Sequence, residues 1–301
     1  MTGGLASIAR PGGGLAMVAI DQRESLRSMF YRRTDGPVAD ETLVDFKLAV
    51  AERLAAHASA MLFDAQFGLD AIEAARRSSG CGVILASDRF VHNGDGLVVE
   101  TDLDEAIPSE LVRSIGAIGL KLLVLWRGHE NSTRCLDLAS RFVERCRRWG
   151  VIAIVEAIVR RPADEISASW DREAAIVEAA AVLSGVRPDL YKAEVPLYGR
   201  GSGAEIQAWA ERVSIACTCP WVVLSTGVNV DDFPHALSAA CRGGASGFLA
   251  GRAIWADAIG PDYRGHLGRV AVPRLQELAR ITDSEARPWF RAGLSDKPSS
   301  A

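Results

Sequence analysis

Short, continuously apolar runs alternate with longer stretches of helical periodicity along most of the chain. The first run, residues 15–20, is apolar at every position and ends at Asp21. Continuous rather than alternating hydrophobicity is typical of a strand that is buried on both faces, as in a parallel sheet. Seven more apolar runs of strand length follow, two of which contain a lysine: residues 60–63, 83–86, 120–126, 151–155, 190–193, 221–224 and 246–250.

Helical patterns follow most of these runs and predict the helices 42–56, 70–78, 132–149, 172–183, 204–216, 231–242 and one that starts near Ala253. Eight strands, each followed by a helical or irregular segment, predict a single-domain α/β protein, a (β/α)8 (TIM) barrel over residues 1–290. A doubly wound sheet usually has fewer strands and needs a glycine loop after a strand, whereas residues 12–14 precede one. The polar tail 291–301 is expected to fray.

Composition and charge narrow the class of protein. The 301 residues are 49% hydrophobic and 24% charged, which is enough apolar material for one large core or two smaller domains. The net charge of -4, with arginines only in short pairs, predicts no nucleic-acid partner. No apolar run approaches the length of a membrane span or a signal segment, so we expect a cytoplasmic protein with no membrane partner. We also expect a homo-oligomer.

Cysteine and histidine spacings give no sign of a metal site. The six cysteines lie in apolar contexts without a CxxC pair, so we interpret them as reduced core residues. The five histidines are scattered. We therefore predict neither a metal nor another cofactor.

The stretch with the most specific chemistry is the run that contains Lys192, which ends close to Pro196. Because proline cannot donate to a strand ladder, Lys192 should lie near the carboxyl end of its strand, where barrel enzymes keep their active sites. A lysine held among apolar walls loses hydration of its charged form and can attack a carbonyl as a neutral amine. The structural alternative is a strand lysine that extends its ammonium group to water.

Barrel closure should bring other polar residues to the same face. Lys121 lies inside the fourth predicted strand, and Glu156 follows the fifth. The remaining strand-end residues include Asp21, Gln22 and Arg23 after the first strand, which we predict to bind substrate, with Asp64, Gln66 and Asp88 after the next two. Any one of these residues could form a structural ion pair in a barrel core, but the convergence of two lysines and a glutamate favours catalysis.

The last two strand ends predict an anion site. Ser225 and Gly227 follow the seventh strand, and Gly251 and Arg252 follow the eighth. Loops at these positions of a barrel commonly bind phosphate through backbone N–H groups, and an arginine adds a bidentate contact. The alternative is a pair of tight turns. The glycine-rich residues 199–203 are either a flexible lid or a plain loop.

Several of these runs resemble class I aldolases of the tagatose-1,6-bisphosphate aldolase family. The resemblance covers nearly the whole predicted barrel and is most specific at the Lys-Ala-Glu-Val-Pro run from Lys192 and the Gly-Phe-Leu-Ala-Gly-Arg-Ala run at residues 247–253. The Leu-Trp-Arg run ending at Arg127 and the Pro-Leu-Tyr-Gly run from Pro196 resemble the branch that cleaves 6-deoxy-6-sulfofructose 1-phosphate to dihydroxyacetone phosphate and 3-sulfolactaldehyde in sulfoquinovose breakdown.

The resemblance implies roles for individual residues. Lys192 matches the Schiff-base lysine, while Glu156 and Lys121 match the proton-relay carboxylate and the second lysine. Ser225, Gly227, Gly251 and Arg252 match the anion-binding loops. Where the family has Glu-Pro, this chain has Glu156 followed by Ala157. The substrate would be a sugar phosphate or a sugar sulfonate. Two alternatives stay open: an aldolase for a tagatose or fructose 1,6-bisphosphate, and a barrel that binds sugar phosphates without catalysis.

Overall fold

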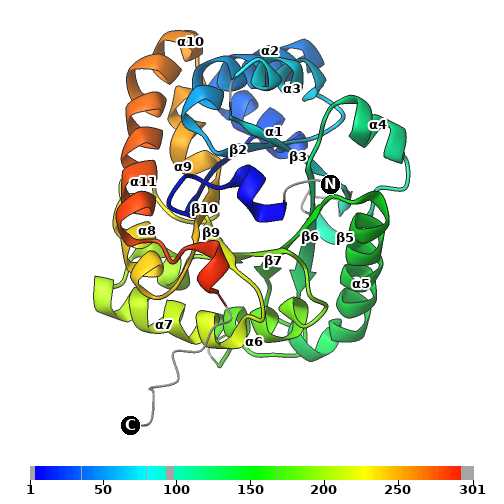
Figure 1. Cartoon of the computed structure of the whole chain (residues 1–301), viewed down its shortest axis with the longest axis vertical. Helices are drawn as coiled ribbons and strands as arrows, with labels where there is room; N and C mark the ends of the chain where they lie inside the picture. The colour runs from blue at the N-terminus through cyan, green and yellow to red at the C-terminus, as the bar shows by residue number, and fades with distance from the viewer. Residues whose placement is uncertain (1–3, 35, 79, 93–97, 168, 293–301) are drawn as a thin grey trace.

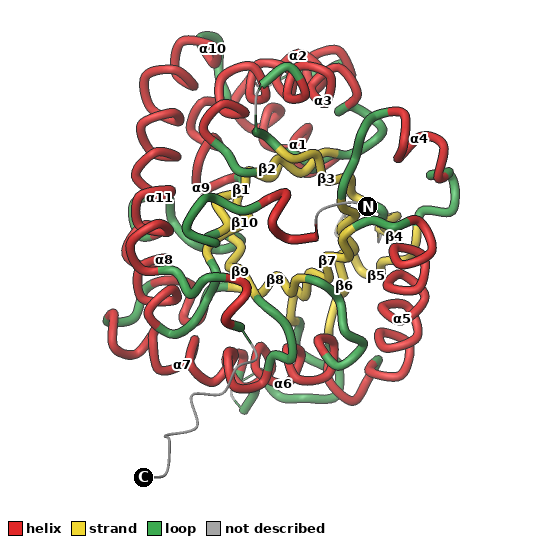
Figure 2. The backbone as a smooth tube through the Cα atoms, viewed as in Figure 1, coloured by secondary structure: helices red, strands yellow, loops and turns green. Residues whose placement is uncertain are grey.

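Eight parallel strands close into a barrel, which confirms the predicted fold. The computed structural model describes residues 4–34, 36–78, 80–92, 98–167 and 169–292. Around the barrel the strands are β1 (Leu15–Ala19), β2 (Ala60–Phe63), β3 (Gly82–Ala86), β6 (Gly119–Trp126), β7 (Ile152–Val159), β8 (Leu190–Glu194), β9 (Trp221–Leu224) and β10 (Gly247–Ala250), and β10 pairs with β1 (Figure 2). Most of the tail that we expect to fray, residues 293–301, lies outside the described ranges.

Helices surround the barrel as an outer ring (Figure 1). They are α1 (Glu24–Thr34), α2 (Asp40–Leu54), α3 (Leu69–Arg76), α4 (Ser109–Ser114), α5 (Ser132–Trp149), α6 (Arg172–Ser184), α7 (Gly203–Ala216), α8 (Phe233–Arg242), α9 (Arg252–Trp255), α10 (Tyr263–His266) and α11 (Val272–Glu285). The predicted helices are present to within two residues at most ends. Part of the glycine-rich stretch 199–203 proves to be the start of α7, where Ser202 and Glu205 form a capping box. Four helices were not predicted: α1, α4, α10 and α11.

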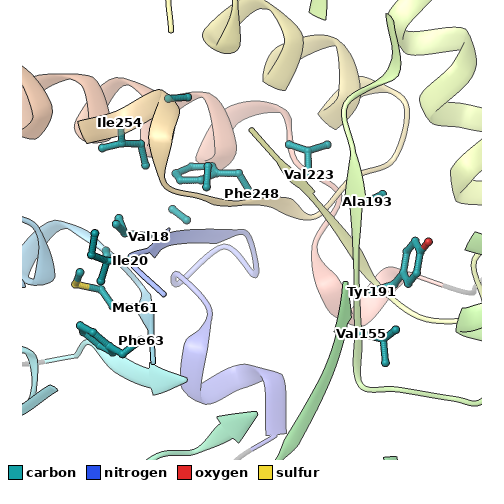
Figure 3. Close-up of a cluster of buried hydrophobic side chains, with 14 of the residues drawn as sticks. Val18, Ile20, Met61, Phe63, Val155, Tyr191, Ala193, Val223, Phe248 and Ile254 are labelled. Carbon is teal, nitrogen blue, oxygen red and sulfur yellow. The ribbon is translucent and has the colours of Figure 1, made fainter. Parts of the chain in front are cut away.

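The continuous hydrophobicity of the strands reflects two apolar layers. Alternate residues of β1 face different sides: Ala16 and Val18 pack with the helices, whereas Leu15 and Met17 belong to a smaller cluster inside the barrel. Figure 3 shows the outer layer, where strand side chains such as Val18 and Phe248 lie beside Ile254. The short 3-10 helix Gly4–Ile8 adds Leu5 and Ile8 to the inner cluster at the amino-terminal end of the barrel.

Two features of the strands differ from the sequence-based expectation. An antiparallel hairpin, β4 (Asp88–His92) and β5 (Val98–Leu103), is inserted between β3 and β6 outside the barrel. In addition, β7 does not end at Glu156 but continues to Val159, because Ala157, Ile158 and Val159 pair with Val124, Leu125 and Trp126 of β6. Glu156 is therefore held inside a strand. Within the described ranges, no helix combines the length and the apolar character needed to cross a membrane.

Candidate active site

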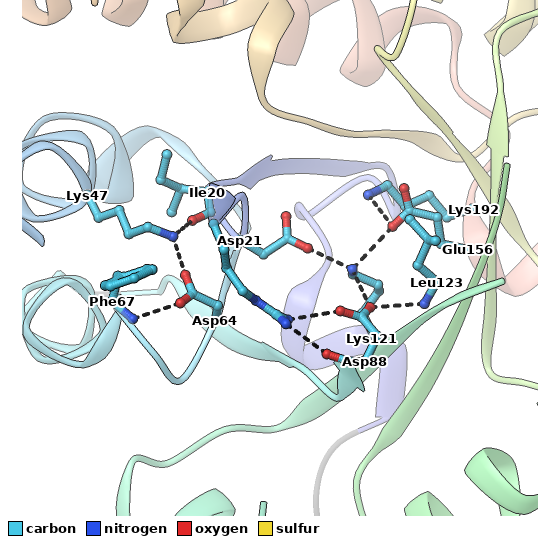
Figure 4. Close-up of polar contacts among 11 residues, drawn as sticks. Ile20, Asp21, Lys47, Asp64, Phe67, Asp88, Lys121, Leu123, Glu156 and Lys192 are labelled. Carbon is cyan, nitrogen blue, oxygen red and sulfur yellow. Dashed lines mark hydrogen bonds and ion pairs between the residues drawn. The ribbon is translucent and has the colours of Figure 1, made fainter. Parts of the chain in front are cut away.

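Lys192, Glu156 and Lys121 project from three adjacent strands into one buried cluster (Figure 4). Glu156 of β7 and Lys192 of β8 are register partners, and Lys192 Nζ donates to Glu156 Oε2 over 3.0 Å. Lys121 of β6 lies 3.5 Å from the same oxygen. A single carboxylate oxygen is thus in contact with the Nζ atoms of two lysines in a site that water barely reaches.

The surroundings of Lys121 keep it charged. Its Nζ lies 2.7 Å from Asp21 Oδ2 and 2.7 Å from Asp88 Oδ2. Burial by itself would lower the pKa of Lys121, but the attraction of Asp21, Asp88 and Glu156 outweighs burial and raises that pKa well above its usual value. For Asp21, burial acts to raise the pKa, yet Lys121 and Lys192 overcome it and hold the pKa below its usual range. Lys121 is therefore a permanent cation in the cluster.

Asp88 and Arg23 fix the other side of the cluster. Asp88 Oδ2 also accepts from the backbone N–H of Leu123 over 3.0 Å. Arg23 donates to Asp88 Oδ1 over 3.0 Å and to the Asp88 carbonyl over 2.9 Å, and its guanidinium lies 4.8 Å from the centre of the Phe90 ring. Arg23, which we predicted to bind substrate, is thus directed to Asp88, and a direct contact with substrate stays a prediction. The sequence places Asp88 at a strand end but does not predict its contacts with Lys121 and Arg23.

The predicted anion loops lie at the ends of β9 and β10. Arg252, the first residue of α9, donates to Thr226 Oγ1 over 2.6 Å, and Ser225 Oγ accepts from the N–H of Ala253 over 3.4 Å. A Cβ atom on Gly251 would lie 2.3 Å from the Ala19 carbonyl oxygen, so no other residue fits there. Burial lowers the pKa of Arg252, although Glu156 and Asp21 partly oppose that effect. The Arg252 guanidinium is therefore largely removed from water and close to the carboxylates of Glu156 and Asp21.

One cavity of about 520 Å³ joins these groups. It is lined by most of the predicted site residues: Asp21, Gln22, Lys121, Glu156, Lys192, Ser225, Gly251 and Arg252. Arg23 and Gly227 are not among its lining residues. The buried Oε1 atom of Gln22 has no hydrogen-bond partner among the described residues, which leaves it available to a ligand hydroxyl.

The cavity extends beyond the predicted cluster, toward the carboxyl ends of β6 and β7. Its wall there contains Leu123, Leu125 and Ile158, followed by Arg127 and Arg160 just past the strand ends. Phe90, Val98 and Val99 of the inserted hairpin complete this wall. Inward-facing residues of a strand recur every second position, so counting in steps of two from Glu156 would have found Arg160. Arg127 belongs to the Leu-Trp-Arg run that the sequence already singles out. The sequence of the hairpin has no comparable pattern that would have predicted its place in the cavity wall.

Comparison with known proteins identifies the family. The model of the DeoC/LacD family aldolases matches residues 15–257. The tagatose 1,6-diphosphate aldolase of Listeria monocytogenes serotype 4a (strain HCC23) is 28% identical over 319 aligned residues, covering 95% of this chain and 93% of that protein. The enzyme of the same name from Lactococcus lactis subsp. lactis is 26% identical, covering 95% and 96%.

Solved structures agree with this fold. An archaeal fructose 1,6-bisphosphate aldolase superposes with a TM-score of 0.62 at 14% identity, covering 92% of this chain and 96% of that one. A Schiff-base-forming fructose-1,6-bisphosphate aldolase gives 0.59 at 13% identity, covering 91% and 96%. At these identities the structures show the fold alone, whereas the family model covers most of the chain. The chain belongs to the DeoC/LacD family of aldolases.

Proposed function

We propose that the protein is a class I aldolase that cleaves 6-deoxy-6-sulfofructose 1-phosphate to dihydroxyacetone phosphate and 3-sulfolactaldehyde through a Schiff base on Lys192. The observation that carries this proposal is the 3.0 Å contact between Lys192 Nζ and Glu156 Oε2 inside a cavity flanked by glycine-containing loops. A buried amine beside a carboxylate has a use in covalent catalysis that a pure sugar-phosphate binder lacks.

The residues supply each step of the reaction. The neutral amine of Lys192 attacks the C2 carbonyl, and loss of water gives a protonated imine. Glu156 accepts the proton of the C4 hydroxyl while the C3–C4 bond breaks, and the bonding electrons move into the imine to give an enamine. The aldehyde leaves, the enamine carbon C3 is protonated, and water releases dihydroxyacetone phosphate. Lys121, a fixed cation, lies 3.5 Å from Glu156 Oε2 and faces the oxygen that takes part in this proton transfer.

The charges of the cavity support a substrate with one dianion and one monoanion. In our proposal the 1-phosphate is bound by backbone N–H groups of the loops at residues 225–227 and Gly251, and the C6 sulfonate contacts Arg252. A sulfonate carries one negative charge at neutral pH, whereas a phosphate monoester carries nearly two. Other cavity cations are partly engaged: Lys121 faces three carboxylates, and Arg127 donates to the Val99 carbonyl over 3.1 Å.

The test is a comparison of kcat/KM for 6-deoxy-6-sulfofructose 1-phosphate with that for fructose and tagatose 1,6-bisphosphates, because this ratio measures transition-state discrimination. A preference of about tenfold for the sulfosugar, or about 1.4 kcal/mol, would support the proposal. Equal or better use of either bisphosphate would reject it.

A second candidate is an aldolase for tagatose or fructose 1,6-bisphosphate. Its support comes from the tagatose 1,6-diphosphate aldolases among the relatives and from the two arginines, Arg127 and Arg160, at the rim of the cavity. A second dianion would use these cations more fully than a sulfonate does. If this candidate is right, substitution of both arginines by methionine should raise KM for a bisphosphate at least tenfold.

A further inference from the structure

We propose that Tyr198 and Arg172 are positioning residues that hold the loop at residues 225–227 in the geometry needed to bind the substrate's phosphate. This inference rests on the proposed function, because it assumes that this loop receives the 1-phosphate. Neither residue lines the cavity or contacts the catalytic cluster.

Directly after β8 the chain adopts an unusual conformation. The 3-10 turn Pro196–Gly199 contains three consecutive residues with left-handed backbone angles, at φ 56° for Leu197, 51° for Tyr198 and 74° for Gly199. Only Arg187 is a further non-glycine residue with positive φ in the described part of the chain. Side chains other than glycine, asparagine and aspartate rarely adopt this conformation, and it persists where surrounding contacts enforce it.

Two charged residues at the start of α6, Arg172 and Glu173, hold the turn. The backbone N–H of Leu197 donates to Glu173 Oε1 over 3.0 Å. The guanidinium carbon of Arg172 lies 3.7 Å from the centre of the Tyr198 ring, a stacking distance. Glu173 Oε1 also accepts from Arg172 over 2.9 Å, so one carboxylate fixes both the turn and the stacked arginine.

The Tyr198 ring packs directly on the loop after β9. A Cβ atom added to Gly227, which has φ 78°, would lie 2.7 Å from Tyr198 Cδ1. A Cβ atom on Gly199 would likewise lie 2.9 Å from Val228 Cγ1. The turn therefore contacts the 225–228 loop at two points, and glycine is needed at both because any side chain would separate them.

The same network reaches the catalytic strands. Arg172 Nη2 lies 2.9 Å from Glu194 Oε1, and Glu194 Oε2 accepts from the N–H of Val159 over 2.7 Å. Arg172 and Glu194 are buried, and Glu194 is two residues beyond Lys192 on β8. The ends of β7 and β8 are thus connected through Arg172 and Tyr198 to the proposed phosphate loop. Because C1 carries the phosphate and C2 reacts with Lys192, the distance between loop and lysine has to be held to a fraction of an ångström.

The decisive variants are Tyr198→Asn and Tyr198→Phe. Asparagine tolerates the left-handed backbone but removes the ring, whereas phenylalanine keeps the ring and removes only the hydroxyl. Calorimetry with inorganic phosphate should show binding weakened about tenfold in Y198N and little changed in Y198F. Arg172→Lys keeps a cation for Glu194 but loses the planar stack, so it should weaken phosphate binding as Y198N does.

Borohydride inactivation with two ketones provides the second readout. With dihydroxyacetone phosphate, Y198N should need about tenfold more ketone for half-maximal inactivation than the wild-type enzyme, while dihydroxyacetone, which lacks the phosphate, should inactivate both equally. Tyr31→Asn, at an exposed tyrosine of α1, is the matched control and should behave as wild type in both assays.

The outcomes separate this role from the proposed function. Unchanged phosphate binding in Y198N, or an equal loss with both ketones, would overturn the positioning role, since the latter indicates general damage to the site. Wild-type protein that binds phosphate but resists inactivation by either ketone would instead refute the Schiff-base proposal. In that case the calorimetric comparison of Y198N with Y198F still decides the positioning role.

Discussion

Lys192 and Glu156 are register partners on adjacent parallel strands, and Lys192 Nζ lies 3.0 Å from Glu156 Oε2. Partnered residues of parallel strands place their side chains on the same face of the sheet, so the barrel itself holds this pair together. Lys121 reaches the same oxygen from β6, but it also contacts Asp21 and Asp88. The two lysines therefore differ in their counter-charges: three carboxylates surround Lys121, whereas Glu156 is the one carboxylate in contact with Lys192 among the described residues.

The different surroundings of the lysines predict which one forms the imine. Treatment with borohydride and dihydroxyacetone phosphate should inactivate the enzyme irreversibly and add the reduced triose to a peptide that contains Lys192. Lys192→Met should abolish turnover and labelling while the far-UV circular dichroism stays that of the wild type, because methionine fills a similar apolar volume. Mass spectrometry locates the label, and a label on Lys121 would contradict the assignment.

Glu156 is predicted to transfer protons. Glu156→Gln keeps the shape of the side chain but cannot accept the C4 hydroxyl proton, so kcat should fall roughly a hundredfold or more, with imine formation partly preserved. Steady-state kinetics and borohydride trapping on the same preparation measure the two effects. The control is Asp164→Gln, which changes an exposed carboxylate that pairs with His129. It should leave both kcat and imine formation unchanged. A normal kcat in E156Q would assign Glu156 to the structural frame.

Lys121 should contribute to stability in a pH-dependent way. The raised pKa of Lys121 means that its stabilisation is fully present below its unfolded pKa and is lost only as pH rises through the higher folded value. The lowered pKa of Asp21 means that its contribution is present above its unfolded pKa and is lost as pH falls toward the folded value. Lys121→Met leaves buried carboxylates without their main cation and should cost about 3–5 kcal/mol at pH 8.

Acid should reduce the loss of unfolding free energy caused by Lys121→Met. Once Lys121 is absent, the burial of Asp21 favours its protonated, uncharged form. Urea unfolding of K121M and wild type at pH 8 and pH 4.5 provides the comparison, and a larger difference at pH 4.5 would contradict the argument. Arg89→Met removes an exposed ion pair with Asp102, in which Arg89 is 60% accessible. That control should change stability by no more than about 1 kcal/mol at either pH.

The cysteines should react slowly in the native protein. Burial raises the pKa of Cys81, Cys219 and Cys241 to about 12 and that of Cys135 to about 11. Because the thiolate is the reactive form, Ellman's reagent at pH 8 should release little thionitrobenzoate until guanidinium unfolds the chain, when all six thiols of the sequence become available. Rapid stoichiometric reaction of a thiol in the folded protein would contradict the argument that burial suppresses formation of its thiolate.

The barrel can be predicted from the amino-acid sequence alone, because strands buried on both faces must be apolar at consecutive positions and because eight such runs alternate with helices. It also placed Lys192 near a strand end and the glycines of the last two loops at the same face. These are local signals, each contained within about ten residues.

The pairing of the buried charges depends on how the strands and helices pack in the folded protein. Asp88 meets Lys121 because β3 lies beside β6 in the barrel, although 33 residues separate them in the chain. Arg23 is directed to Asp88 by the inserted hairpin, and Arg172 reaches Tyr198 only when α6 packs beside the end of β8. An ion pair depends on distances of a few ångströms between side chains, and the pattern of apolar and polar positions along the sequence does not specify those distances.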